Sequence, residues 1–135
     1  MAIWRNVTMR LLLDTHVFFW FMTESVLLKE QHKLMIDDQS HSIFVSAVTA
    51  WEMATKVKLD KWAGAEVLLP KLTASVVRAG MAPLDLTMRQ AEIAGSLPLV
   101  HRDPFDRMLV AQSLDLDMPV LTVDPALARL GCKTL

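Results

Sequence analysis

The 135-residue sequence has little cysteine, little glycine and no long apolar run, and each absence excludes a class of protein. A single cysteine, Cys132, excludes an internal disulfide and any zinc site built on several cysteines. We expect it to be a small buried side chain. Four glycines form no glycine-rich phosphate loop, and the absence of a G-x-S-x-G motif excludes the usual serine hydrolase arrangement.

The apolar runs are also too short for a membrane protein. The longest run near the start, Val17–Met22, is far below the ~20 residues that a membrane span needs. Asp14 and His16 interrupt any signal-peptide core. One unpaired thiol agrees with a reducing compartment. We therefore expect a cytoplasmic protein that has no membrane contact.

What is present indicates one well-filled domain. Hydrophobic residues make up 53% of the chain and charged residues 21%, which argues against disorder. We expect an extension over residues 1–8, followed by a single domain over residues 9–135. The net charge is −1, so a nucleic-acid partner would have to be attracted by a local patch of positive charge.

Short apolar runs alternate with helical patterns along this domain. Strands are expected at Arg10–Leu13, Ser42–Ser46, Met81–Leu86 and Pro119–Val123, with a further candidate at Cys132–Leu135. Helices are expected at His16–Met22, Val26–Asp37, Ala47–Leu59, Ala65–Ala79, Met88–Ser96 and Pro104–Leu116, with a short one from Pro125 to Gly131. Strands separated by helices of this length predict an α/β fold with parallel pairing and helices on both faces of the sheet.

Acidic residues fall where such strands end. Asp14 interrupts the apolar segment "RLLLDTHVFFWFM", and a buried charge is costly unless it is paired. It either serves a site or caps the next helix. Asp124 follows the fourth strand, Glu52 lies in the helix after the second, and Asp106 lies in the first turn of a helix opened by Asp103. Ligands bind at the carboxyl ends of strands in open α/β sheets, so these acids mark a candidate site.

Four of these acids also have simpler structural explanations. Asp103 and Asp124 each precede a proline, as N-cap residues do. Asp106 is placed to complete a capping box or to interact with the helix dipole. Glu52 lies four residues before Lys56, which predicts an exposed ion pair.

The helical periodicity around Glu52 allows it to face solvent. The apolar stripe consists of Ala47, Ala50, Trp51, Ala54 and Val57. This stripe points away from Glu52, which is therefore free to face solvent.

Taken together, the acids predict a cation site. Two unit charges 4 Å apart repel by ~4 kcal/mol at an effective dielectric constant near 20, so a cluster of carboxylates without a cation would destabilise the fold. Mg²⁺ and Mn²⁺ prefer oxygen ligands and join carboxylates to substrate phosphates. The residue types fit such an ion.

Four sequence blocks resemble the signature blocks of PIN-domain nucleases, and in particular the VapC-type toxin ribonucleases of toxin–antitoxin pairs. They are "RLLLDTH", "VSAVTAWEMATKVKLDK", "LPLVHRDPFDRMLVAQS" and "PVLTVDPAL", and the resemblance runs from about Met9 to Leu135. It implies a three-layer α/β/α sandwich with a central, mostly parallel sheet. It also implies an Mg²⁺- or Mn²⁺-dependent endoribonuclease that leaves 5′-phosphate and 3′-hydroxyl ends. The implied partners are RNA, a cognate antitoxin and a second copy of the chain.

The resemblance also implies roles for particular residues. The catalytic and metal-binding acids would be Asp14, Glu52, Asp106 and Asp124. Glu52 would either bind the ion or orient the attacking water as a general base. The supporting residues would be Thr15, which would hold Asp14 or a metal-bound water, Thr122, which lies near the last acid, and Asp103, which is chiefly a cap.

Basic and aromatic side chains leave further alternatives open. His101, Arg102 and Arg107 either contact substrate phosphates or pair with the adjacent carboxylates. Lys56, Lys58 and Lys61 form either a basic patch for RNA or a solvated helix face. The segment "VFFWFM" is apolar on every side, so it must be buried in the domain's own core, in a homodimer seam or in a groove that holds an antitoxin segment.

Two other classes of protein compete with a nuclease. The first is a non-catalytic α/β binding module that keeps the acids as helix caps. The second is another α/β phosphate enzyme. An aspartyl phosphatase would need a second Asp two residues after Asp14, where His16 stands, and a phosphorelay receiver would need paired acids and a late lysine that we do not find.

Overall fold

The computed structural model describes residues 8–135, which include only Thr8 of the expected extension. Four parallel strands form one sheet in the order β3-β2-β1-β4. The strands are β1 (Arg10–Leu13), β2 (Ser42–Ser46), β3 (Ala82–Leu84) and β4 (Val120–Leu121). The helices are α1 (Thr15–Met22), α2 (Glu30–Asp37), α3 (Ala47–Lys58), α4 (Leu72–Arg78), α5 (Met88–Ser96), α6 (Pro104–Leu116) and α7 (Pro125–Arg129), with a 3₁₀ turn η2 at Ala65–Val67. The α/β prediction is confirmed.

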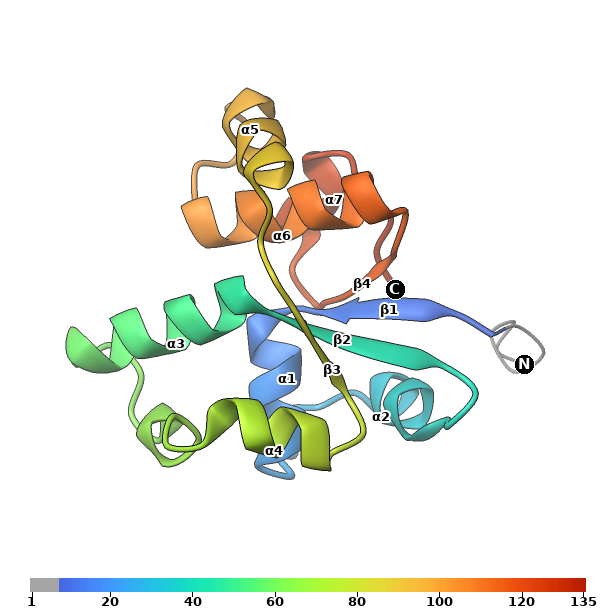
Figure 1. The fold of residues 1–135 in the computed structure, drawn as a ribbon, viewed down its shortest axis with the longest axis vertical. Helices are drawn as coiled ribbons and strands as arrows, with labels where there is room; N and C mark the ends of the chain where they lie inside the picture. Colours follow the sequence, from blue (N-terminus) through green and yellow to red (C-terminus); the bar gives the residue numbers. More distant parts are fainter. Residues whose placement is uncertain (1–7) are drawn as a thin grey trace.

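Helices cover both faces of this sheet (Figure 1). Helices α5, α6 and α7 lie on one side of it, and α1, α2 and α4 lie on the other. The segment Lys133–Leu135 runs beside β4, since the Val120 amide donates to the Lys133 carbonyl and the Leu135 amide donates to the Val120 carbonyl. This segment forms a parallel bridge to β4 through Thr134 and not a full strand.

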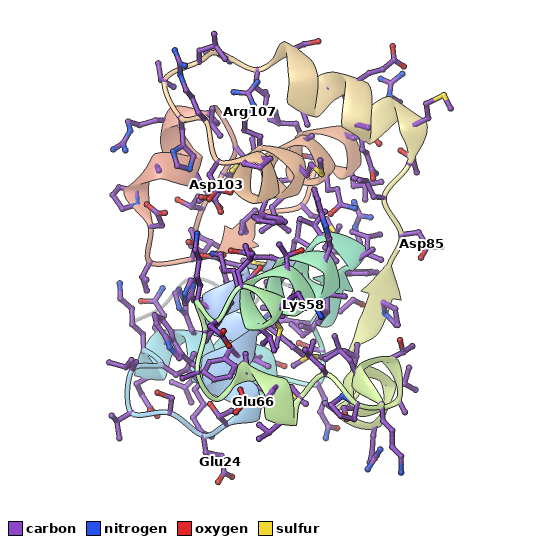
Figure 2. The ribbon with its side chains drawn as sticks, turned by 90° about the vertical axis from the view of Figure 1, so that its left-hand side faces the viewer. Glu24, Lys58, Glu66, Asp85, Asp103 and Arg107 are labelled. Carbon is purple, nitrogen blue, oxygen red and sulfur yellow. The ribbon has the colours of Figure 1, made fainter. Side chains whose placement is uncertain are left out.

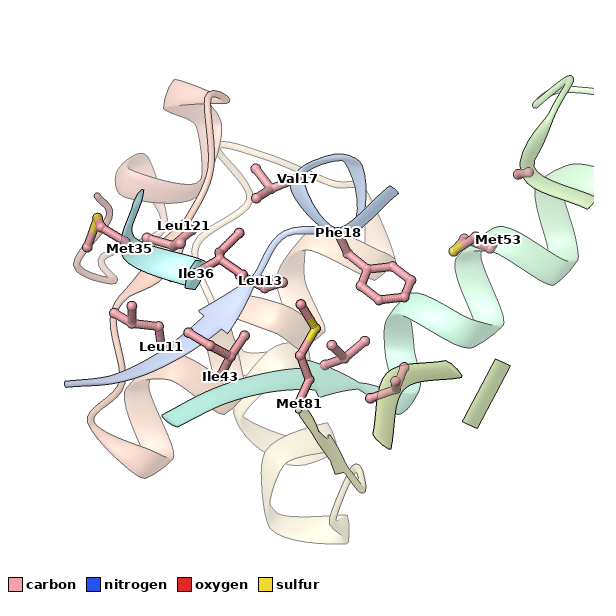
Figure 3. Close-up of a cluster of buried hydrophobic side chains, with 13 residues drawn as sticks. Leu11, Leu13, Val17, Phe18, Met35, Ile36, Ile43, Met53, Met81 and Leu121 are labelled. Atoms are coloured by element: carbon pink, nitrogen blue, oxygen red, sulfur yellow. The ribbon is translucent and has the colours of Figure 1, made fainter. Parts of the chain in front are cut away.

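The central strand β1 supplies both halves of the core. Its side chains alternate between the faces of the sheet, so Leu11 and Leu13 join one buried cluster and Leu12 joins the other. The first cluster includes Phe18 of α1 and Met53 of α3 (Figure 3). The second cluster is built mainly from α6, β4 and the chain after α7, and it includes Cys132, which is buried as expected. A continuous apolar run is therefore what a strand covered on both faces requires.

Two of the expected helices are wrong in extent. The helix expected over residues 65–79 is broken into η2 and α4, because Pro70 cannot donate its backbone nitrogen within a helix and clashes with the preceding turn. Lys71 follows with a φ of 61°. The helix expected from Val26 begins only at Glu30. Its first part is a turn in which the Ser25 hydroxyl accepts a hydrogen bond from the Leu27 amide, and Val26 is almost fully exposed.

Helix α1 is buried on only one side. Val17 and Phe18 are fully buried in the core, which confirms that part of the expectation. Phe19, Phe21 and Met22 pack against the edge of the first cluster and stay half-exposed. Within residues 8–135, no helix combines the length and apolar character needed to cross a bilayer.

Candidate active site

The carboxyl ends of the strands open into a pocket of about 300 Å³ that collects the predicted acids. Its lining consists of Asp14, His16, Trp20, Glu52, Lys56, His101, Asp103, Asp106, Val123 and Asp124. Figure 2 looks onto the side of the molecule where the start of α6, marked by Asp103, and helix α3, marked by Lys58, are both visible. Four elements therefore bring five acids from distant parts of the chain to one place.

Asp14 is the most deeply buried aspartate of the pocket, with an exposed fraction of 5%. It precedes α1 but makes no side-chain cap bond, so capping does not explain it. Its Oδ2 accepts a 2.7 Å hydrogen bond from the Thr122 hydroxyl. Burial raises the pKa of Asp14, the Thr122 hydrogen bond and nearby His16 act in the opposite direction, and the negative charge of Glu52 raises it further.

Thr122 connects two of the acids, whereas Thr15 does not contact Asp14 through its side chain. The Thr122 hydroxyl donates to Asp14 and accepts a 3.0 Å hydrogen bond from the Asp124 amide. Thr15, expected to support Asp14, instead pairs its hydroxyl with that of Thr49 at 3.1 Å. Thr15 is the first residue of α1, and the side-chain support for Asp14 comes from Thr122, which directly follows β4.

Asp106 faces the same pocket from the first turn of α6. Its Oδ2 lies 2.7 Å from His101 Nε2, so His101 pairs with an adjacent carboxylate, as one of the alternatives proposed. Burial raises the pKa of Asp106 to about 6; the His101 contact opposes this, and the charges of Asp103, Asp14 and Glu52 reinforce it. The mutual influence of these acids shows that they lie close enough to repel one another.

Glu52 is buried, although the helical periodicity left it free to face solvent. It is 4% exposed, and the buried face of α3 consists of Val48, Thr49, Glu52 and Met53. The expected apolar stripe is wrong, because Trp51 lies on the surface and this face packs against α1 and the sheet. Glu52 Oε2 accepts a hydrogen bond from Lys56 Nζ, and Glu52 Oε1 is buried without any hydrogen-bond partner.

Asp103 and Asp124 are helix caps and also line the pocket. Asp103 Oδ1 accepts hydrogen bonds from the amides of Phe105 and Asp106, at 2.9 and 3.1 Å. Asp124 Oδ1 accepts one from the Ala126 amide at 2.9 Å. The capping interpretation is confirmed for both residues. Each carboxylate uses only one oxygen in capping, so the second oxygen remains available to the pocket.

Comparison with known proteins identifies the family. The sequence matches the PIN domain over residues 11–132. The chain belongs to the PIN domain family. No curated relative matches the sequence.

Solved structures with this PIN fold cover nearly the whole chain at low sequence identity. VapBC2 from Rickettsia felis, bound to a promoter DNA fragment, is 13% identical with a TM-score of 0.67 and covers 94% of this chain and 98% of its own. FitAcB from Neisseria gonorrhoeae is 19% identical with a TM-score of 0.67, over 93% and 96%. A toxin–antitoxin complex from Klebsiella pneumoniae is 14% identical with a TM-score of 0.57, over 84% and 86%. At these identities the likeness shows the fold alone.

The two arginines near the acids of this PIN domain are placed very differently. Arg102 is exposed. Arg107 is 7% exposed, and its guanidinium donates hydrogen bonds to several backbone carbonyls, those of Ala94, Gly95, Leu97, Pro98 and His101. Its guanidinium therefore lies among backbone carbonyls and pairs with no carboxylate. Arg107 holds the loop between α5 and α6 in place.

The donor set of the pocket fits a hard divalent cation. Within residues 8–135, no three His, Cys, Asp or Glu side chains stand close enough together, as arranged, to hold an ion. The pocket nevertheless offers the unpartnered Glu52 Oε1 and carboxylates whose pKa values are raised by burial and mutual repulsion. A divalent cation relieves both penalties, because it supplies a partner for buried oxygens and cancels their charge. In this structure Lys56 is the partner of Glu52 and His101 is the partner of Asp106, so these two side chains compensate the acids in part.

Proposed function

We propose that the protein is a metal-dependent endoribonuclease that hydrolyses RNA phosphodiester bonds and acts as the toxin of a toxin–antitoxin pair. The supporting observation is one pocket that gathers Asp14, Glu52, Asp106 and Asp124 at the carboxyl edge of a PIN-fold sheet. A buried, unpartnered carboxylate oxygen within a group of repelling acids is hard to explain by stability alone.

Asp14, Glu52, Asp106 and Asp124 are the residues that would hold Mg²⁺ or Mn²⁺. Such an ion lowers the pKa of a bound water and neutralises charge on the phosphate as the phosphodiester is hydrolysed. Glu52 would either contribute to binding the ion or take a proton from the attacking water.

Other side chains keep these acids in position. Thr122 orients Asp14 through its hydroxyl and is itself fixed by the Asp124 amide. Lys56 holds Glu52 at one oxygen and leaves the other free. His101 pairs with Asp106 through its Nε2.

Cleavage of single-stranded RNA with and without Mn²⁺ tests this proposal, with sequencing of the released ends. We expect products with 5′-phosphate ends only when the metal is present, and we expect Asp14→Asn to abolish their formation without unfolding the protein. Asp85→Asn is the matched control, since Asp85 is an exposed aspartate that does not line the pocket (Figure 2). Unchanged cleavage by purified Asp14→Asn would reject the proposed site.

An antitoxin partner and a homodimer belong to the same proposal. The solved structures with this fold include one named as a toxin–antitoxin complex. A second pocket, of about 780 Å³, lies between α1 and α2 and offers an apolar surface to such a partner. It is lined in part by half-exposed Phe21, Met22 and Leu28 beside the almost fully exposed Val26.

Expression of the chain should arrest growth, and co-expression of the protein encoded by the adjacent upstream reading frame should relieve the arrest. Light scattering of the purified chain tests the dimer.

A further inference from the structure

The tryptophans of residues 8–135 gather around the acidic pocket. Trp20 lines the pocket directly. Trp62 stacks on the pocket residue His16, with ring centroids 4.6 Å apart and planes 20° apart. Trp51 immediately precedes Glu52 and packs on Phe105, the neighbour of Asp106. We call His16, Trp20, Trp51, Trp62 and Phe105 the aromatic rim.

Lys56 lies between the two sides of this rim. Its ammonium group is 5.7 Å from the Trp62 ring centroid and 5.9 Å from that of Phe105. It is also the only lysine or arginine among the residues that line the pocket. The pocket mouth therefore combines flat aromatic surfaces with one positive charge, directly beside the acids. Proteins that hold single-stranded nucleic acid use this combination: the rings stack on bases and the cation attracts the backbone.

Trp51 is the ring of the rim whose exposure is least explained by packing. It is 49% exposed, although tryptophan has the largest apolar surface of any side chain. Its contact with Phe105 is T-shaped, with centroids 4.6 Å apart and planes at 68°. Such a contact uses the edge of one ring, so ring surface remains free for another partner.

We infer that the aromatic rim, and Trp51 above all, stacks an unpaired base of the RNA next to the bond to be cleaved. This inference rests on the proposed ribonuclease function, and it assigns the contact with the base to the exposed ring of Trp51. A base inside a duplex already stacks on its neighbours and pairs with its partner, so it cannot also lie against Trp51. Lys56, whose ammonium group also pairs with Glu52, is the cation of the pocket lining that would meet the phosphate beside the stacked base.

The inference predicts that Trp51 matters for unpaired RNA only. The probe is an end-labelled oligoribonucleotide, free or annealed to its complement, titrated with protein in the presence of a chelator so that the strand stays intact. Trp51→Ala should weaken binding of the single strand by about 5- to 100-fold and leave binding of the duplex unchanged. Trp51→Phe should keep most of the affinity, because it retains a ring. Met88→Ala, which alters an exposed apolar side chain on α5, is the control and should bind as the wild type does.

The other outcomes separate this inference from the function on which it rests. Wild-type affinity of Trp51→Ala for the single strand overturns the inference, while metal-dependent cleavage by the wild type would still support the nuclease. Equal losses of affinity for the single strand and the duplex in Trp51→Ala, together with a shift from dimer to monomer in gel filtration, also overturn the inference. Trp51 would then lie in an interface between two copies of the chain. Loss of single-strand binding in Trp51→Ala, when the wild type cleaves no RNA with Mn²⁺, supports the base site and rejects the nuclease.

Discussion

At the scale of single residues, two aspartates of α6 have pKa values shifted in opposite directions. Burial and neighbouring acids raise the pKa of Asp106 to about 6, above its unfolded value of 3.8. At neutral pH its ionised form therefore destabilises the folded protein, and stability is regained as the pH falls from above 6 toward 4. In the metal-free protein, Asp106→Asn should raise the free energy of unfolding by about 1–3 kcal/mol at pH 7.5. Thermal melts from pH 7.5 to 4 should show the gain vanishing.

Asp115 provides the matched control, with the opposite sign. Hydrogen bonds from Arg89 and Gln90 hold the pKa of its carboxyl below the usual value. Its stabilising contribution is present above pH 4 and is lost as the pH falls through the lowered pKa. Asp115→Asn should therefore lower the melting temperature near neutral pH and have little effect in acid. If Asp106→Asn lowered the stability at pH 7.5, as Asp115→Asn is expected to do, the result would contradict the idea that the surroundings of Asp106 destabilise its ionised form.

The Thr122 hydroxyl should matter for Asp14 more than the adjacent Thr15 hydroxyl does. Thr122→Val keeps the shape of the side chain but removes the donor to Asp14 and the acceptor for the Asp124 amide. We expect Mn²⁺ affinity, measured by calorimetry, to fall by roughly 10- to 100-fold, as when a group that orients a metal ligand is lost. Thr122→Ser should restore it. Thr15→Val should have a smaller effect on metal affinity, because its hydroxyl contacts Thr49 and not an acid.

Individual residues were predictable where local rules apply. Asp103 and Asp124 precede prolines, and this pattern is enough to identify N-caps. The support of Asp14 by Thr122 spans 108 residues of sequence, and only the sheet brings the two together. The burial of Glu52 was missed because Trp51 was counted in the apolar stripe, whereas the helix buries the face of Val48 and Met53.

At the scale of elements, Arg107 joins α6 to the loop that follows α5. Its guanidinium satisfies carbonyls that would otherwise be buried without donors, among them those of Ala94 and Leu97. Arg107→Met, of similar length, should lower the free energy of unfolding by about 2–4 kcal/mol in urea titrations. Arg102→Met is the control and should leave stability unchanged, since Arg102 is exposed. A stable Arg107→Met protein with impaired RNA binding would instead support a direct role in substrate binding.

Most elements were predictable from hydrophobic periodicity and caps, and the exceptions have identifiable causes. All four strands occur where short apolar runs predicted them. The central strand β1 has the continuous apolar signature of a strand covered on both faces, whereas the edge strand β3 keeps Pro83 exposed. The helical periodicity of apolar residues continues across Pro70 and across the turn before Glu30, so it predicted helix where the backbone does not form one. At both places backbone constraints override the apolar pattern. The order of the strands in the sheet depends on long-range pairing. The alternation of strands and helices limits the possible orders but does not select one of them.

At the scale of the whole molecule, the acids of the pocket lower the stability of the folded state, and a bound cation would restore that stability. The four acids come from the end of β1, from α3, from α6 and from the loop after β4, so they converge only when both halves of the core have assembled. The unfolded chain presents no such cluster and should bind a divalent cation weakly. Binding of a cation at the proposed site would therefore be linked to folding, and a change in stability would report on that site without any assay of cleavage.

This linkage distinguishes a nuclease from a non-catalytic module with the same fold. An ion at 100 times its dissociation constant stabilises the folded state by about 2.7 kcal/mol. For a chain of this size that corresponds to a rise in melting temperature of roughly 10 °C. Mn²⁺ should produce this rise in the wild type and in Asp85→Asn, and not in Asp14→Asn. No rise in the wild type would mean that Asp103 and Asp124 serve the protein only as helix caps and that the family's fold is used here for binding alone.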